Sequence, residues 1–179
     1  MARPCGFLMI LVLMSYWSTC SLGCDLSKID NFMNKTLLNL LVPKKQSSRL
    51  NCLKEKKDFQ CPLEKMDAQQ IPKPQLIQVL YDVIQQSYRL FTSKESSAAW
   101  ETIPREKFRN ILYSQLNAKQ SCLVQHEGEY PVKKYFKNIT VYLRKKKHSP
   151  CAWTVVRDEV WRAWSLSANL LKGFNKEEE

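Results

Sequence analysis

The chain has 179 residues and a formal net charge of +11, from 28 Lys and Arg residues against 17 Asp and Glu residues. This length fits one domain, and the presence of only four glycines disfavours a fold of short strands joined by tight glycine turns. The basic balance favours an acidic partner, such as a polysaccharide, a nucleic acid or a protein surface, without choosing among them.

The N-terminal segment has the pattern of a secretory signal peptide. A positive residue precedes the apolar run FLMILVLM, and small residues follow at the spacing of a cleavage site after Gly23. An uncleaved anchor is the alternative, but the run is too short to span a bilayer, and no later run is long enough. We therefore expect residues 1–23 to be removed and residues 24–179 to form a single secreted domain that does not insert into membranes.

Apolar residues recur every three or four positions in five segments, which predicts five amphipathic helices. The first ends at Pro43, and residues 43–71 form a long irregular stretch. The second begins near Pro72 and the third near Pro104, because proline suits the first turn of a helix. The last two have the clearest apolar faces: Val132, Tyr135, Phe136, Ile139, Tyr142 and Leu143, then Trp153, Val156, Val160, Ala163 and Trp164. The last helix is expected over about Ala152 to Leu171. Five such amphipathic helices can bury one core, so the sequence predicts an all-α bundle.

Five cysteines remain in the expected mature chain: Cys24, Cys52, Cys61, Cys122 and Cys151. In an oxidising compartment they are disulfide candidates, and an odd number leaves one free or paired between chains. The cysteine pattern by itself does not choose the pairs. A zinc site is disfavoured because the chain has only two histidines and no C-x-x-C spacing.

No catalytic signature is present. The chain has no nucleophile elbow, no Gly-rich phosphate loop and no dinucleotide fingerprint, so no cofactor is expected. His126 and His148 are expected to be solvated surface residues. Asp158 and Glu159 are adjacent, so on a helix they point about 100° apart and cannot act as a facing pair. An enzyme is therefore a remote alternative.

Six sequence blocks resemble the type I interferons, in the same order. SPCAWTVVRDEV resembles the start of that family's last helix, and CDL resembles the N-terminus of the alpha and omega members. CLKEKKDFQCP, SSAAWE, KKYFKNITVYLRKKKHSPCAW and SLSANL resemble the first long loop, the start of the third helix, the fourth helix and the end of the fifth. The resemblance implies a secreted five-helix, up-up-down-down cytokine bundle with a long first loop. Such a cytokine bridges the two chains of its receptor, and their kinases then induce antiviral genes.

The same resemblance implies the disulfides Cys24–Cys122 and Cys52–Cys151. Cys61 is then the odd cysteine, at a position where alpha interferons usually carry an aromatic or aliphatic residue. We expect a buried free thiol that packs as a small hydrophobe in a monomeric protein. The alternative is an intermolecular disulfide through Cys61, which would give a covalent dimer.

The family's two receptor footprints correspond to two sets of residues here. The set for the high-affinity receptor chain, called the high-affinity surface below, is Leu53, Lys56, Arg157, Trp161, Arg162, Ser165 and Leu166. The set for the low-affinity chain, called the low-affinity surface, is Tyr88, Arg89, Arg109, Tyr113 and Lys133. Lys56 replaces an arginine and so loses a planar donor fork. Trp161 lies off the apolar face beside arginines, the composition of a binding hot spot, although an isolated surface aromatic is the alternative.

Asn34 and Asn138 begin N-x-Thr sequons and are glycosylation candidates. Two other functions remain open beside the agonist cytokine. One is an antagonist that occupies the receptor without signalling. The other is a basic module that binds heparan-type polyanions, which the run RKKKH over residues 144–148 motivates. Nucleic acid is not expected, because no aromatic residues alternate with these cations to stack on bases.

Overall fold

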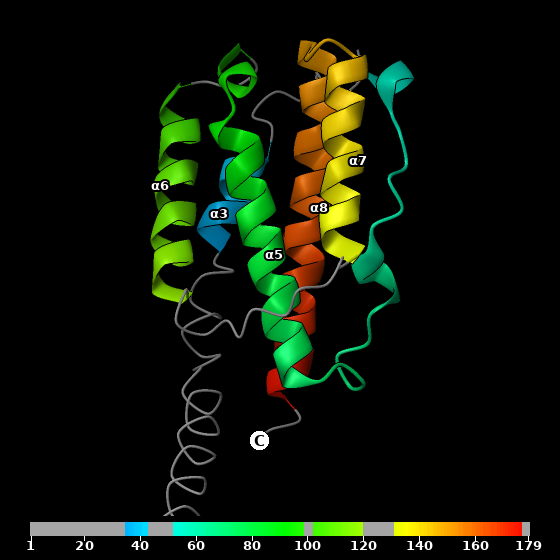
Figure 1. Cartoon of the computed structure of the whole chain (residues 1–179), viewed down its shortest axis with the longest axis vertical. Helices are drawn as coiled ribbons and strands as arrows, with labels where there is room; N and C mark the ends of the chain where they lie inside the picture. Colours follow the sequence, from blue (N-terminus) through cyan, green and yellow to red (C-terminus); the bar gives the residue numbers. More distant parts are fainter. Residues whose placement is uncertain (1–34, 43–51, 99–101, 120–130, 177–179) are drawn as a thin grey trace, which may run out of the picture.

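The computed structural model describes residues 35–42, 52–98, 102–119 and 131–176. The all-α prediction is confirmed: these residues form helices and connections, with no β-strand among them. The α-helices are α3 (Lys35–Leu41), α5 (Lys73–Thr92), α6 (Thr102–Lys119), α7 (Pro131–Lys145) and α8 (Pro150–Asn175). In Figure 1, α5 and α7 run upward and α6 and α8 run downward, so α8 is antiparallel to both α5 and α7 that pack against it.

The predicted apolar face of α7 is confirmed in full, because all six of its residues are buried. The predicted face of α8 is likewise buried, including Trp153 and Trp164. α8 is longer than predicted, since it begins at Pro150 and continues to Asn175. Its start is fixed by Ser149, whose hydroxyl accepts a hydrogen bond from the Ala152 amide at 3.2 Å. Pro150 follows in the first turn, where a backbone N–H would have no partner within the helix, so proline costs no hydrogen bond there.

Aromatic rings join α5, α6 and α8 in the centre of the bundle. The Phe91 ring lies 5.2 Å from that of Phe108 and 6.0 Å from that of Trp153, and the Phe108 ring lies 6.2 Å from that of Trp164. These side chains are almost fully shielded from solvent. Trp164 also carries a polar group into this core, and its indole Nε1 donates to the Ser87 hydroxyl at 2.9 Å.

The long first loop lies along the outside of α7 and α8 (Figure 1). Its described part begins at Cys52 and is irregular as predicted, apart from two short 3-10 helices, η1 (Leu53–Glu55) and η2 (Pro62–Lys65). η2 contacts both α7 and α8, and η1 contacts α8. The loop therefore contributes surface beside the last helix rather than a layer of the core.

The expectation of a solvated His148 is wrong. Its side chain is half-buried, and its ring lies 6.1 Å from that of Trp153. The turn that ends α7 has left-handed backbone at Lys147 and His148, with φ of 51° and 53°. The His148 amide donates to the Leu143 carbonyl at 2.9 Å, which closes the helix end and turns the ring inward. His126 lies outside the described residues.

None of the described helices is long and apolar enough to cross a membrane. The described residues also contain no group of His, Cys, Asp and Glu that could hold a metal ion. Cys24, Cys122, Asn34 and the first part of the first predicted helix lie outside the described residues. Residues 1–23 do as well, so the signal peptide and the domain boundary after it stay predictions.

Replacing Ser87 with alanine should destabilise the bundle. The substitution leaves the buried Trp164 N–H without its hydrogen-bond acceptor, which costs about 1–3 kcal/mol. Ser114→Ala on the exposed face of α6 is the matched control and should change stability by less than about 0.5 kcal/mol. Chemical denaturation monitored by circular dichroism measures both variants. Equal stability of the two would show that the Ser87–Trp164 bond contributes nothing.

Candidate functional site

Most of the high-affinity surface lies along one strip of α8. Arg157, Trp161 and Ser165 follow one another at intervals of four residues, and Arg162 and Leu166 lie next to the latter two. Trp161 is 39% exposed, whereas Trp153 is 2% and Trp164 1% exposed. The predicted division of the tryptophans between an outer and a core face is therefore confirmed.

A disulfide anchors the described part of the first loop to the start of α8, next to this strip. Cys52 is bonded to Cys151, in the first turn of α8, with the two Cα atoms 5.1 Å apart. This is the pair that the resemblance implied. Leu53 begins η1, which contacts α8, and Lys56 follows it with an exposed side chain. Leu53 and Lys56 thus lie on the segment that the disulfide joins to the start of α8.

Arg157 connects the strip to α3. Its guanidinium Nη2 donates to the carbonyl oxygen of Leu41, the last residue of α3, at 3.3 Å. The final carbonyls of a helix have no partner within the helix and carry partial negative charge, so a cation is favourable there. This side chain therefore also has a structural role, since it joins the first and last described helices.

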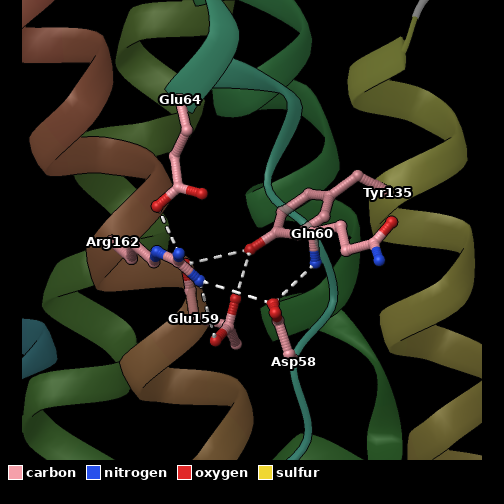
Figure 2. A network of polar contacts seen from close by, with 6 residues as sticks. All are labelled: Asp58, Gln60, Glu64, Tyr135, Glu159 and Arg162. Atoms are coloured by element: carbon pink, nitrogen blue, oxygen red, sulfur yellow. Dashed lines mark hydrogen bonds and ion pairs between the residues drawn. The ribbon is translucent and has the colours of Figure 1, made fainter.

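Arg162 holds the first loop against α8 (Figure 2). Its guanidinium forms an ion pair with Glu64 of η2 and lies 3.9 Å from Asp58 Oδ1 and 3.6 Å from Glu159 Oε1. Glu159 also accepts a hydrogen bond from the Tyr135 hydroxyl of α7 at 2.9 Å. We call these five residues the Arg162 network, and it connects the loop, α7 and α8.

The backbone of the loop is shaped to reach this network. Gln60 has left-handed backbone with φ of 52°, and its amide donates to Asp58 Oδ1 at 2.9 Å. Phe59, the residue between Asp58 and Gln60 in the sequence, is buried, and its ring lies 5.2 Å from the ring of Tyr142 on α7. The Tyr142 hydroxyl in turn donates to the Glu55 carbonyl at 2.9 Å. One apolar anchor and several polar contacts therefore fix the loop to α7.

Cys61 lies beneath this network and is a free thiol with 2% exposure. Burial raises the pKa of the Cys61 thiol, which keeps it protonated at neutral pH and less reactive. Burial, followed by the charge of Glu159, also raises the pKa of Tyr135, so its hydroxyl remains a hydrogen-bond donor. Burial raises the pKa of Glu159 as well, against the effects of the Tyr135 hydrogen bond and the Arg162 charge. A buried sulfur has little access to a thiol of a second molecule, which disfavours a dimer linked through Cys61.

Sequence reasoning did not identify Asp58, Glu64, Tyr135 or Glu159 as site residues. Tyr135 belongs to an apolar stripe, and only the structure shows that its hydroxyl reaches α8. The available signal was Glu159 three residues before Arg162, an ion-pair spacing on a helix. Nothing in the sequence indicated that acids of the loop would meet the same arginine.

The low-affinity surface falls on both sides of the exposed face of α5. On the side of α6, the rings of Tyr88 and Tyr113 lie 6.2 Å apart, and Tyr113 is 55% exposed. Arg109 lies one turn before Tyr113 and pairs with Glu106 at 3.7 Å. On the side of α7, Arg89 lines a groove of about 330 Å³ that Arg144 and His148 also line. The structure therefore brings the two tyrosines together and places Arg89 apart from them.

Lys133, the last predicted member of this surface, forms an ion pair within the protein. Its Nζ lies 3.9 Å from Oδ1 of Asp82, a fully buried residue of α5 that also accepts a hydrogen bond from Gln78 at 3.1 Å. Burial raises the pKa of the Asp82 carboxyl, although the Lys133 charge opposes this. Ionisation of Asp82 therefore lowers the stability of the folded protein.

Asp82→Asn should stabilise the protein at neutral pH. A carboxyl whose pKa is raised by folding disfavours the folded state once it ionises, so the cost grows as pH rises through the range between the unfolded and the raised pKa. Below about pH 3 the carboxyl is mostly protonated in both states, and the variant and the wild type should converge. Denaturation at several pH values measures the difference. A variant less stable than the wild type at neutral pH would mean that the contact with Lys133 outweighs the burial cost.

The attachment of the loop can be tested at Arg162. Arg162→Gln should speed amide hydrogen exchange over residues 58–64 about fivefold, because an ion-pair network of this exposure contributes roughly 1 kcal/mol to local closure. Lys172→Gln on the same helix removes one exposed charge outside the network and should leave that exchange unchanged. Equal exchange in both variants would show that the loop is held without Arg162.

Asn138 has an exposed side chain on α7, so the structure leaves this sequon accessible. Thr140, the third residue of the sequon, donates its hydroxyl to the Phe136 carbonyl at 3.0 Å.

The described residues form an all-helical bundle whose long first loop is linked by a disulfide to the last helix, beside a strip that carries the exposed Trp161. This defines a helical-bundle protein with a candidate binding surface. The family model "Interferon alpha/beta domain" matches residues 26–174. Human interferon alpha-7 and interferon alpha-4 are 44% and 43% identical to this chain, and each alignment covers 99% of it and 100% of the relative. Zebrafish interferon 2 shares the fold, with a TM-score of 0.65 at 24% identity, over 78% of this chain and 96% of that one.

The chain therefore belongs to the type I interferon family. It is a cytokine of antiviral innate immunity, and the members of this family are signalling proteins rather than enzymes.

Proposed function

We propose that the protein is secreted and bridges the two chains of the type I interferon receptor. Bridging brings together the Janus kinases on the receptor's cytoplasmic side, which then induce antiviral genes. Membership of the interferon family supports this function, and it requires no chemistry from the cytokine itself. Residues 1–23 are proposed to be the signal peptide, and Cys24 and Cys122 to form a second disulfide.

One observation carries the high-affinity side of this proposal: Trp161 is 39% exposed in the middle of an arginine-bearing strip of α8. A large exposed aromatic side chain flanked by arginine has the composition of an interface hot spot. The loop beside the strip is held by the disulfide and by the Arg162 network. A surface ordered before binding loses less conformational entropy on association, which favours affinity.

The low-affinity side is proposed to use the Tyr88–Tyr113 pair, with Arg89 and Lys133 across the exposed face of α5. Tyr113 is 55% exposed and presents a large amphipathic ring. Lys133 is shared with Asp82, and Arg109 with Glu106, so part of their charge is already compensated within the protein. A weaker contact on this side is consistent with that compensation.

Trp161→Ala should weaken binding to the high-affinity receptor chain by about 2 kcal/mol, or roughly thirtyfold in Kd, because it truncates a proposed hot spot. Its free energy of unfolding should barely change, since the side chain lies off the core. Trp153→Ala is the matched control on the same helix and should destabilise the fold by about 3–5 kcal/mol. Surface plasmon resonance and chemical denaturation give the two readouts.

The opposite pattern would remove the proposed surface. If Trp161→Ala unfolded the protein while Trp153→Ala only weakened receptor binding, the strip on α8 would not be the receptor-facing side. Unchanged receptor binding by a folded Trp161→Ala variant would equally exclude Trp161 as a contact.

A further inference from the structure

The exposed face of α7 carries a stripe of cations. Lys134, Lys137, Arg144 and Lys145 are all exposed, and their positions fall within about 100° around the helix axis, opposite the buried face. No Asp or Glu occurs anywhere from residue 131 to residue 157. The four side chains, called the α7 stripe, therefore form a surface of one sign of charge.

The α7 stripe differs from its neighbours in having no ion-pair partner among the described residues. Two neighbouring lysines do have acidic partners, Lys133 with Asp82 at 3.9 Å and Lys146 with Glu55 at 2.7 Å. The residues of the stripe make no ion pair with any residue of the described ranges. Like charges close together on one helix repel each other, which costs free energy unless an external anion neutralises them.

The turn after the stripe extends it at a further cost. Lys147 is exposed and has left-handed backbone with φ of 51°, at the position after a helix end where glycine is the favoured residue. A non-glycine residue there costs about 1 kcal/mol. The residue that takes this position is another exposed cation, which follows the stripe in the sequence.

We propose that the α7 stripe and Lys147 bind a sulfated polysaccharide. Sulfate groups keep their charge at all physiological pH values, and lysine offers each of them a compact ammonium point charge. From Lys134 to Lys147 the site extends roughly 20 Å along the helix, so it suits a linear polymer better than a single anion. Counterions released from the polymer would supply most of the binding free energy.

The structure favours this polymer over two other anionic surfaces. Binding single-stranded nucleic acid relies on aromatic side chains that stack on bases, and the stripe contains none. Binding to a membrane surface needs an apolar face next to the cations, and Val141, at 37% exposure, is the single large hydrophobic residue exposed on α7. Asn138 lies about 40° around the helix from Lys134, so a glycan on it would cover part of the stripe.

The test measures the salt dependence of binding to immobilised heparin, with the mature protein carrying Asn138→Gln so that no glycan is present at that position. The stripe variant combines Lys134→Gln, Lys137→Gln, Arg144→Gln and Lys145→Gln. The control variant combines Lys65→Gln, Lys107→Gln, Lys172→Gln and Lys176→Gln, which are also exposed and make the same change in net charge. Affinity of the stripe variant at physiological salt should fall at least about tenfold, and its salt slope by about one for each cation that no longer pairs with a sulfate. The control variant should bind almost as the parent does.

Several outcomes would overturn the proposal. These are equal reductions in affinity in the two variants, no binding of heparin by the parent, and equal binding of chemically desulfated heparin or of single-stranded DNA of matched length. Circular dichroism and chemical denaturation verify that each variant is folded, and the milder Arg144→Gln, Lys145→Gln double variant replaces the stripe variant if that one is not. The inference does not rest on receptor bridging, because the heparin and receptor measurements are independent.

Discussion

The attachment of the first loop to α7 and α8 is the constraint on which the candidate receptor surface depends. The loop has little regular structure, so ordering it costs roughly 1–2 kcal/mol of backbone entropy per residue. Three kinds of contact offset that cost: the Cys52–Cys151 disulfide, the buried Phe59 ring and the ion pairs of Arg162. Without them, Lys56 and its neighbours would have no fixed position relative to α8.

The disulfide and the ion pairs act at different levels. The disulfide joins residues 99 positions apart, and closing a loop of that length restricts the unfolded chain by about 4–5 kcal/mol in the entropy model. The ion pairs that join Arg162 to the loop contribute less to global stability, because Arg162, Asp58 and Glu64 are partly exposed to solvent. Their effect is local, since they set where η2 lies against the last helix. Arg162 is therefore a positioning residue as well as a candidate contact residue.

The helices of the core could be predicted from the sequence because a buried helix face leaves a regular apolar pattern. The six buried residues of α7 and the burial of Trp153 against exposed Trp161 follow from that pattern alone. The Cys52–Cys151 pair required the resemblance to the interferons. Contacts between elements could not be predicted, because they depend on how segments approach each other. The Arg162 network and the burial of Asp82 are of this kind, and so is the inward turn of His148.

The proposed function has this cytokine signal through two receptor-binding surfaces and without catalysis. An interferon-response reporter assay in cells of the same species, with antibodies that block either receptor chain, tests this claim most directly. Receptor bridging predicts a dose-dependent response that is abolished by blocking either chain. No response at any dose from a folded protein that binds the receptor would indicate an antagonist, and a response that survives both antibodies would contradict receptor bridging.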